Sequence, residues 1–166
     1  MADIVAERFI ARTTLSATST SVTFTGIPGS YTDLVLVSSL ATTSGTGGYS
    51  VRFNGDTGTN YSFTSLNGNG TSATSSRYSN EVGIRIAWQG QANTILGSQV
   101  SITSIPNYSN STTYKNALTR DNNASVGLSA VIGTWRNTAA ITSLTIWTPD
   151  AITFAIGTTF TLYGIV

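Results

Sequence analysis

The chain has 166 residues, of which eight are Lys or Arg and seven are Asp or Glu, and it contains neither Cys nor His. Disulfides and thiolate metal sites are therefore excluded, and the commonest general base and metal ligand is missing. Only 9% of the residues are charged, against about 25% in an average globular protein, and Lys115 is the single lysine. This composition argues against nucleic-acid binding, and no apolar run approaches the roughly 18 residues of a membrane-spanning helix.

The first fifteen residues differ in composition from the rest. Four of the chain's charged residues fall in the first twelve positions, namely Asp3, Glu7, Arg8 and Arg12. The large apolar residues among them are Ile4, Val5, Phe9 and Ile10. Residues 1–15 are therefore predicted to be either the edge strand that begins a sandwich or an arm that docks on a partner. They lack the cleavage pattern of a signal peptide, so we do not expect one.

Beyond residue 15, alternation of apolar and polar residues dominates, which is typical of strands. Segments with this pattern are 21–28, 31–40, 49–55, 60–66, 81–90, 98–106, 112–120, 124–135, 141–149 and 157–166. The segment 112–120 is the weakest candidate. No segment here forms a convincing amphipathic helix. About eight to ten short strands at regular spacing predict an all-β antiparallel sandwich or barrel, with residues 16–166 as one domain.

Two segments depart from simple alternation. Residues Leu34 to Val37 are apolar on both faces, as in a strand that is covered from both sides. The segment 67–76 lacks large apolar residues and is predicted to be an exposed loop.

The stretch RFNGDTGTNYSFTSLNGNG at residues 52–70 raises the question of a calcium site, because Asn54, Asp56 and Asn60 loosely resemble a calcium loop. Such a loop needs several acids, a closing Glu and flanking helices. Here Asp56 is the only acid and the flanks are strand-like. Asn-Gly is instead the preferred pair for a type I′ turn, because both positions need positive φ. The stretch therefore predicts a hairpin, with no metal site.

Catalytic patterns are missing from the sequence. A glycosidase needs two facing carboxylates, and only a fold that brought Asp56 and Glu81 together would supply them. No G-x-S-x-G elbow occurs, and a serine nucleophile would have no His base. We expect no enzyme activity and no cofactor.

The three tryptophans raise the question of sugar binding, because exposed aromatic rings stack on sugars. Trp88 and Trp147 lie in apolar alternating runs, which favours core positions. Trp135 stands next to Arg136 in IGTWRNT and is predicted to lie at the surface.

The chain resembles small virion proteins of tailed phages, cyanophage proteins among them, from about Thr20 onward. The resemblance rests on the segments GIPGSYTDLVLV, RFNGDTGTNYSFT, SIPNYSNSTTYK, VGLSAVIGTWRNTAAITSLTIW and GTTFTLYGIV, without one diagnostic motif. It implies a β-sandwich of jelly-roll type, without a catalytic residue set. It further implies either a capsid decoration (cement) protein, often trimeric, or a domain of a tail appendage.

The expected function is therefore that of a homotrimeric decoration protein on the capsid surface of a virion, bound to the major capsid protein. The residues expected to dock on the capsid are Ile4, Val5, Arg8, Phe9, Ile10 and Arg12. The alternative is a receptor-binding or tail-fibre module that recognises host surface glycans. The residues expected to bind glycan in that case are Arg77, Tyr78, Trp135 and Arg136.

Overall fold

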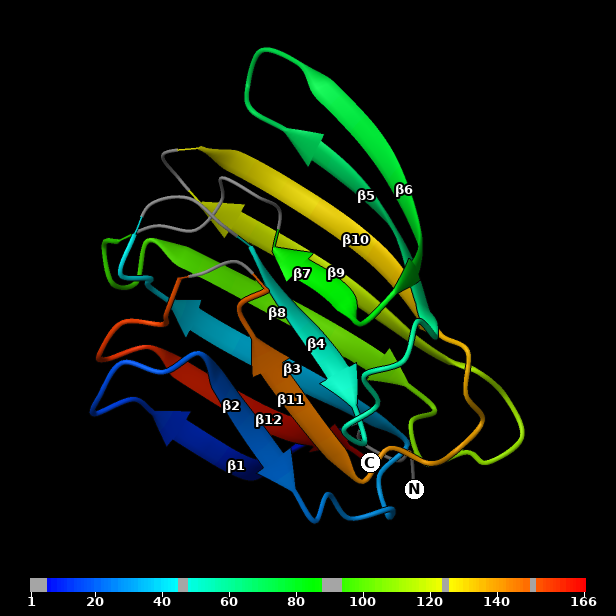
Figure 1. Ribbon diagram of the computed structural model, residues 1–166. Coiled ribbons are helices and arrows are strands. Elements are labelled where there is room, and N and C mark those ends of the chain that lie inside the picture. Colours follow the sequence, from blue (N-terminus) through cyan, green and yellow to red (C-terminus); the bar gives the residue numbers. More distant parts are fainter. Residues whose placement is uncertain (1–5, 45–47, 88–93, 124–125, 150–151) are drawn as a thin grey trace.

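The computed structural model describes residues 6–44, 48–87, 94–123, 126–149 and 152–166. These residues form twelve strands and no helix (Figure 1). No described helix could therefore span a membrane. All strand pairs are antiparallel and lie in two sheets, which confirms the predicted antiparallel β-sandwich. The jelly-roll connectivity stays a prediction.

The larger sheet has eight strands and the smaller sheet has four. In spatial order the larger sheet contains β1 (Glu7–Thr14), β12 (Thr159–Ile165), β3 (Asp33–Leu40), β8 (Gln99–Pro106), β9 (Lys115–Asn123), β10 (Gly127–Trp135), β5 (Tyr61–Gly68) and β6 (Ala73–Glu81). The smaller sheet contains β2 (Ser21–Thr25), β11 (Ser143–Trp147), β4 (Tyr49–Phe53) and β7 (Ile84–Ala87). Figure 1 shows the β5–β6 hairpin extending beyond the smaller sheet.

The core lies between the two sheets because successive side chains of a strand point to opposite faces. In β3, the side chains of Leu34, Leu36, Ser38 and Leu40 point toward the smaller sheet and are fully buried. The residues that alternate with them point to the opposite side and are half-buried. Apolar side chains of the smaller sheet that meet them in the core are Val22, Phe24, Val51, Phe53, Ile84, Ile86, Leu144 and Ile146. Each such side chain stabilises the fold by roughly 1.5–3 kcal/mol.

The tight turn predicted at Asn54-Gly55 is confirmed, but the hairpin is wrong. Asn54 and Gly55 have φ values of 53° and 67°, and the Asp56 N–H donates to the Phe53 carbonyl at 2.9 Å. However, β4 pairs with β11 and β7, whereas β5 pairs with β10 and β6. The turn therefore carries the chain from the smaller sheet to the larger one, since both strands bury one face in the core between the sheets.

The loop predicted at 67–76 is also wrong, because β6 begins at Ala73 and pairs with β5 over its whole length. The connection is short: the Asn69 side chain accepts hydrogen bonds from the backbone N–H groups of Thr71 and Ser72 at 3.0 and 2.9 Å. The segment is exposed, as expected. β6 is an edge strand that extends beyond the core and buries few side chains. It therefore needs no alternating apolar residues, and the sequence pattern did not predict it as a strand.

Candidate functional site

The larger sheet has an outer face, the side that points away from the smaller sheet. Its apolar residues include Phe9, Val35, Val37, Leu66, Val100, Ile102, Leu118, Leu128, Ala130, Ile132 and Tyr163. Five of the large side chains are about half exposed or more: Phe9, Leu66, Leu118, Leu128 and Ile132. Soluble monomers rarely expose contiguous apolar patches of more than a few hundred Å², so a patch of this kind indicates an interaction surface.

The strand register makes the outer face contiguous. Leu118 on β9 lies opposite Ile132 on β10, and Asn122 lies between Val100 on β8 and Leu128 on β10. Directly opposite residues have their Cβ atoms about 5 Å apart, so their side chains touch. These side chains form one surface across the middle of the sheet.

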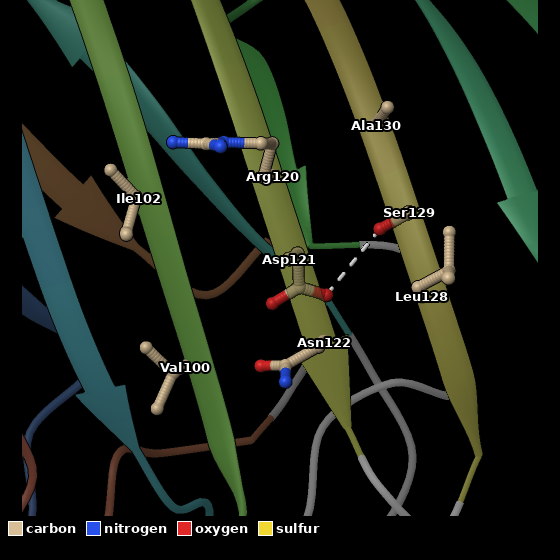
Figure 2. A pocket seen from close by; sticks show the side chains of 8 residues that line it. All are labelled: Val100, Ile102, Arg120, Asp121, Asn122, Leu128, Ser129 and Ala130. Carbon is tan, nitrogen blue, oxygen red and sulfur yellow. Dashed lines mark hydrogen bonds between the residues drawn. The ribbon is translucent and has the colours of Figure 1, made fainter.

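A shallow groove runs along the centre of the outer face. Figure 2 shows its lining side chains, which come from β8, β9 and β10. The side chains on the outer side of the groove are Val100, Ile102, Arg120, Asn122, Leu128 and Ala130. Arg120 extends from β9 toward Ile102 on β8, so a guanidinium group lies among apolar neighbours.

Three arginines share the outer face. Arg12 donates from Nε to Thr161 Oγ1 at 3.0 Å, whereas Arg77 and Arg120 make no hydrogen bond or ion pair with any described residue. The carboxylates on this side, Glu7 and Asp33, lie where β1 and β3 begin, at one end of the face. The middle of the face is therefore apolar and positively charged.

Behind the groove, on the inner side of β9, Asp121 is buried with only 3% of its surface exposed. Its carboxylate accepts hydrogen bonds from Tyr49 Oη at 3.2 Å, from Gln99 Nε2 at 3.1 and 3.3 Å, and from Ser129 Oγ at 3.4 Å. Burial raises the pKa of Asp121 to about 7, although these hydrogen bonds act to lower it.

Three buried oxygens near Asp121 find no hydrogen-bond partner among the described residues: Ser38 Oγ, Ser101 Oγ and Gln99 Oε1. Ser38 pairs with Ser101 across β3 and β8, and Ser101 pairs with Asp121 across β8 and β9. A polar row therefore crosses the inner face, where apolar residues are usual. No group of three carboxylates that could hold a metal ion occurs within the described ranges.

The residues that loosely resemble a calcium loop are held by the protein itself. Asp56 Oδ2 accepts from Trp135 Nε1 at 2.7 Å and from Asn60 Nδ2 at 2.9 Å, and Oδ1 accepts from the Gly58 N–H at 2.8 Å. Partial burial acts to raise the pKa of Asp56, but these hydrogen bonds and the nearby Arg52 lower it below its ordinary value. The Asp56 carboxylate thus stabilises the turn that follows β4.

The surface position predicted for Trp135 is wrong. Only 1% of this residue is exposed, and its ring lies 5.7 Å from that of Phe53 and 6.2 Å from that of Tyr61, between ring centroids. The core position predicted for Trp147 is also wrong, because this residue is half-buried on the face of the smaller sheet that points away from the core. The Arg52 guanidinium lies 3.8 Å from its ring centroid. Trp88 lies outside the described residues.

The four residues predicted to bind glycan do not form one surface. Arg77 and Tyr78 are neighbours on β6 and point to opposite sides of the sheet, where Tyr78 stacks on Phe63 at 4.8 Å between ring centroids. Arg136 donates to the Thr59 carbonyl at 2.7 Å and so ties the end of β10 to the turn before β5.

The residues predicted to form a docking arm lie on β1, as far as the structure describes them. Arg8, Phe9, Ile10 and Arg12 belong to this edge strand, which pairs with β12. Ile4 and Val5 lie outside the described residues. Phe9 packs edge-on against Tyr163 at 6.3 Å, and Phe9 and Arg12 continue the outer face. Arg8 lies on the opposite side of the sheet, and Ile10 packs against the core.

The outer face was not identified as a site from the sequence, although a signal was present. Two strands of the larger sheet carry apolar residues on both faces: Leu34 to Val37 in β3, and Val131-Ile132 in β10. This pattern is typical of strands that are covered from both sides. The smaller sheet covers only one of those sides.

No protein-family model and no curated protein matches the chain.

Proposed function

We propose that the chain is a non-enzymatic structural protein of a virion, a capsid decoration (cement) protein. In this role a homotrimer binds the outer surface of the capsid, contacts the major capsid protein and stabilises the contacts between capsid subunits. The observation that supports it best is the outer face, an apolar surface that spans an eight-stranded sheet.

The dimensions of the sheet suit such a role. Eight strands about 4.8 Å apart, each about eight residues long, form a face of roughly 900 Å². A stable protein–protein interface buries about 800 Å² on each partner. Burial of a large apolar side chain contributes roughly 1.5–3 kcal/mol before the costs of association.

The sandwich also leaves strand edges open. β1 and β6 end the larger sheet, and β2 and β7 end the smaller one. Open edges are aggregation hazards that natural proteins cover or blunt. A symmetric trimer is one way to cover them, which supports the homo-oligomer in this proposal.

The proposal is tested by the copy number of the chain in purified virions, measured by quantitative mass spectrometry against the major capsid protein. We expect hundreds of copies per particle. A few to a few dozen copies would contradict a decoration role and point to a tail position. Absence from the particle would contradict any virion role.

The alternative, a tail module that recognises glycans, has less support from the geometry. Trp135 is buried, and Arg77 and Tyr78 point to opposite sides of β6. These residues cannot contact one sugar together.

A further inference from the structure

We propose that the outer face docks on a protein surface that is apolar and carries carboxylates, and that Arg120 is the central contact. This inference deepens the proposed function and rests on it, because it names the chemistry of the capsid surface that the chain binds. It also moves the docking site from the predicted arm at the N-terminus to the middle of the larger sheet.

Arg120 lies at the centre of the outer face, on β9. In the register, Arg120 lies between Ile102 on β8 and Ala130 on β10. On the same strand and the same side, Leu118 precedes it and Asn122 follows it. Its guanidinium group is therefore surrounded mainly by apolar side chains and has no partner among the described residues.

A partner that covers this face must also satisfy Arg120. Burial of a guanidinium group without a counter-charge costs several kcal/mol, whereas a carboxylate can bind it through two parallel hydrogen bonds. An apolar partner surface alone would therefore be rejected. The partner must place a carboxylate opposite Arg120.

The other charges of the outer face extend the same requirement. Arg12 lies in the same cross-strand row, connected through Thr161, Val37 and Ile102. Arg77 lies at the opposite edge, on β6. A complementary partner therefore carries several carboxylates along a band that crosses the strands.

A second copy of the chain does not meet this requirement. Two outer faces would bring three arginines on each copy toward one another, which costs free energy. Of the two carboxylates at the end of the face, Asp33 already accepts a hydrogen bond from the Asn107 N–H at 2.8 Å. The charges thus favour a different, acidic protein surface over self-association through this face.

The first test measures the binding of the purified chain to capsids that lack it, with Arg120→Glu compared with Thr25→Glu. Thr25 is exposed on β2, and its side chain lies on the face of the smaller sheet that points away from the core, so this variant also introduces an acid but away from the site. We expect Arg120→Glu to weaken binding at least about 30-fold. We expect Thr25→Glu to change it by less than about threefold.

The second test does not depend on capsids. The dye 8-anilinonaphthalene-1-sulfonate combines an apolar ring system with an anion, the chemistry expected of the partner. It should bind the wild-type chain and the Thr25→Glu variant equally, and the Arg120→Glu variant at least about tenfold more weakly. Unchanged melting temperatures of both variants show that the fold is intact.

The outcomes separate the two proposals. Equal dye binding and equal capsid binding by all three proteins would overturn the inference. Altered dye binding with no capsid binding by the wild type would support the apolar, anion-binding face and contradict the decoration role. A change of oligomeric state in Arg120→Glu, measured by analytical ultracentrifugation, would show that a second copy covers the face and would overturn the inference.

Discussion

At the scale of single residues, Asp56 shows how one carboxylate connects the two sheets. It lies in the turn that leaves β4, and it accepts the indole N–H of Trp135, which ends β10 in the larger sheet. Trp135 is buried, and Asp56 is the hydrogen-bond acceptor of its indole N–H. The hydrogen bond therefore fixes the direction in which the chain crosses between the sheets.

We predict that Asp56→Ala lowers the free energy of unfolding by about 2–3 kcal/mol, because it leaves the buried indole N–H unsatisfied. In the Asp56→Ala background this hydrogen bond is already lost, so Trp135→Phe should not lose its free energy a second time. A double-mutant cycle, measured by urea unfolding, gives the free energy of the hydrogen bond as the departure from additivity. Because the pKa of Asp56 is lowered on folding, its stabilisation should be present above about pH 4 and lost at lower pH. Full additivity of the two substitutions would contradict this prediction.

Asp121 has the opposite effect on pH dependence. Its pKa is raised by burial to about 7, so the folded state binds a proton more tightly than the unfolded state. The contribution of this group to stability is therefore complete below about pH 4 and is lost as the pH rises through 7. The free energy of unfolding of the wild-type chain should therefore fall as the pH rises from about 4 to 7.

We predict that Asp121→Asn flattens this profile. At pH 9 the variant should be more stable than the wild type, by up to about 4 kcal/mol from the shift in pKa. Gln99 Oε1, which has no described partner, can accept the new amide N–H if the Gln99 amide rotates. Urea unfolding at a series of pH values checks the prediction. Parallel profiles of variant and wild type would show that Asp121 is not the titrating group.

At the scale of elements, the distance between the sheets depends on small residues where strands of the two sheets cross. Gly133 on β10 faces Ile84 on β7, and a Cβ atom built on it would lie 2.4 Å from Ile84 Cγ2. The glycine at position 133 thus permits contact between the larger and the smaller sheet.

We predict that Gly133→Ala lowers the free energy of unfolding by about 1–3 kcal/mol, because overpacking forces the sheets apart. Gly29→Ala is the matched control, since its Cβ would lie 3.9 Å from Ser109 Cβ, an ordinary contact. The control should change stability by less than about 0.5 kcal/mol. Equal unfolding midpoints for both variants in urea would contradict this account of the contact between the sheets.

At the scale of the whole molecule, the unequal sizes of the sheets are the main fact. Four strands in the smaller sheet cover one side of the larger sheet, and the other side is the outer face. Apolar residues on both sides of β3 and β10 are typical of strands that are covered on both faces, and the proposed docking would supply the second cover. With few charges and a net charge of +1, the chain has little electrostatic protection against unspecific association.

The sequence by itself determined the strands and the type of turn. Alternation with a period of two is a local property of the chain, so it located ten of the strand segments, and Asn54-Gly55 identified a turn that needs positive φ at both positions. Polar β6 escaped this reasoning because an edge strand need not bury a face. The outer-face residues were each seen as strand residues, but not as one surface.

Only the tertiary structure decided which strands share a sheet, and with it the burial of particular residues. Trp135 is buried because Phe53 and Tyr61, far from it in sequence, pack against its ring. Asp121 is buried because alternation in β9 points it toward the smaller sheet, whereas Arg120, one residue earlier, points outward. Pairing between distant strands fixes these contacts, and a local pattern carries no information about which strand becomes a neighbour.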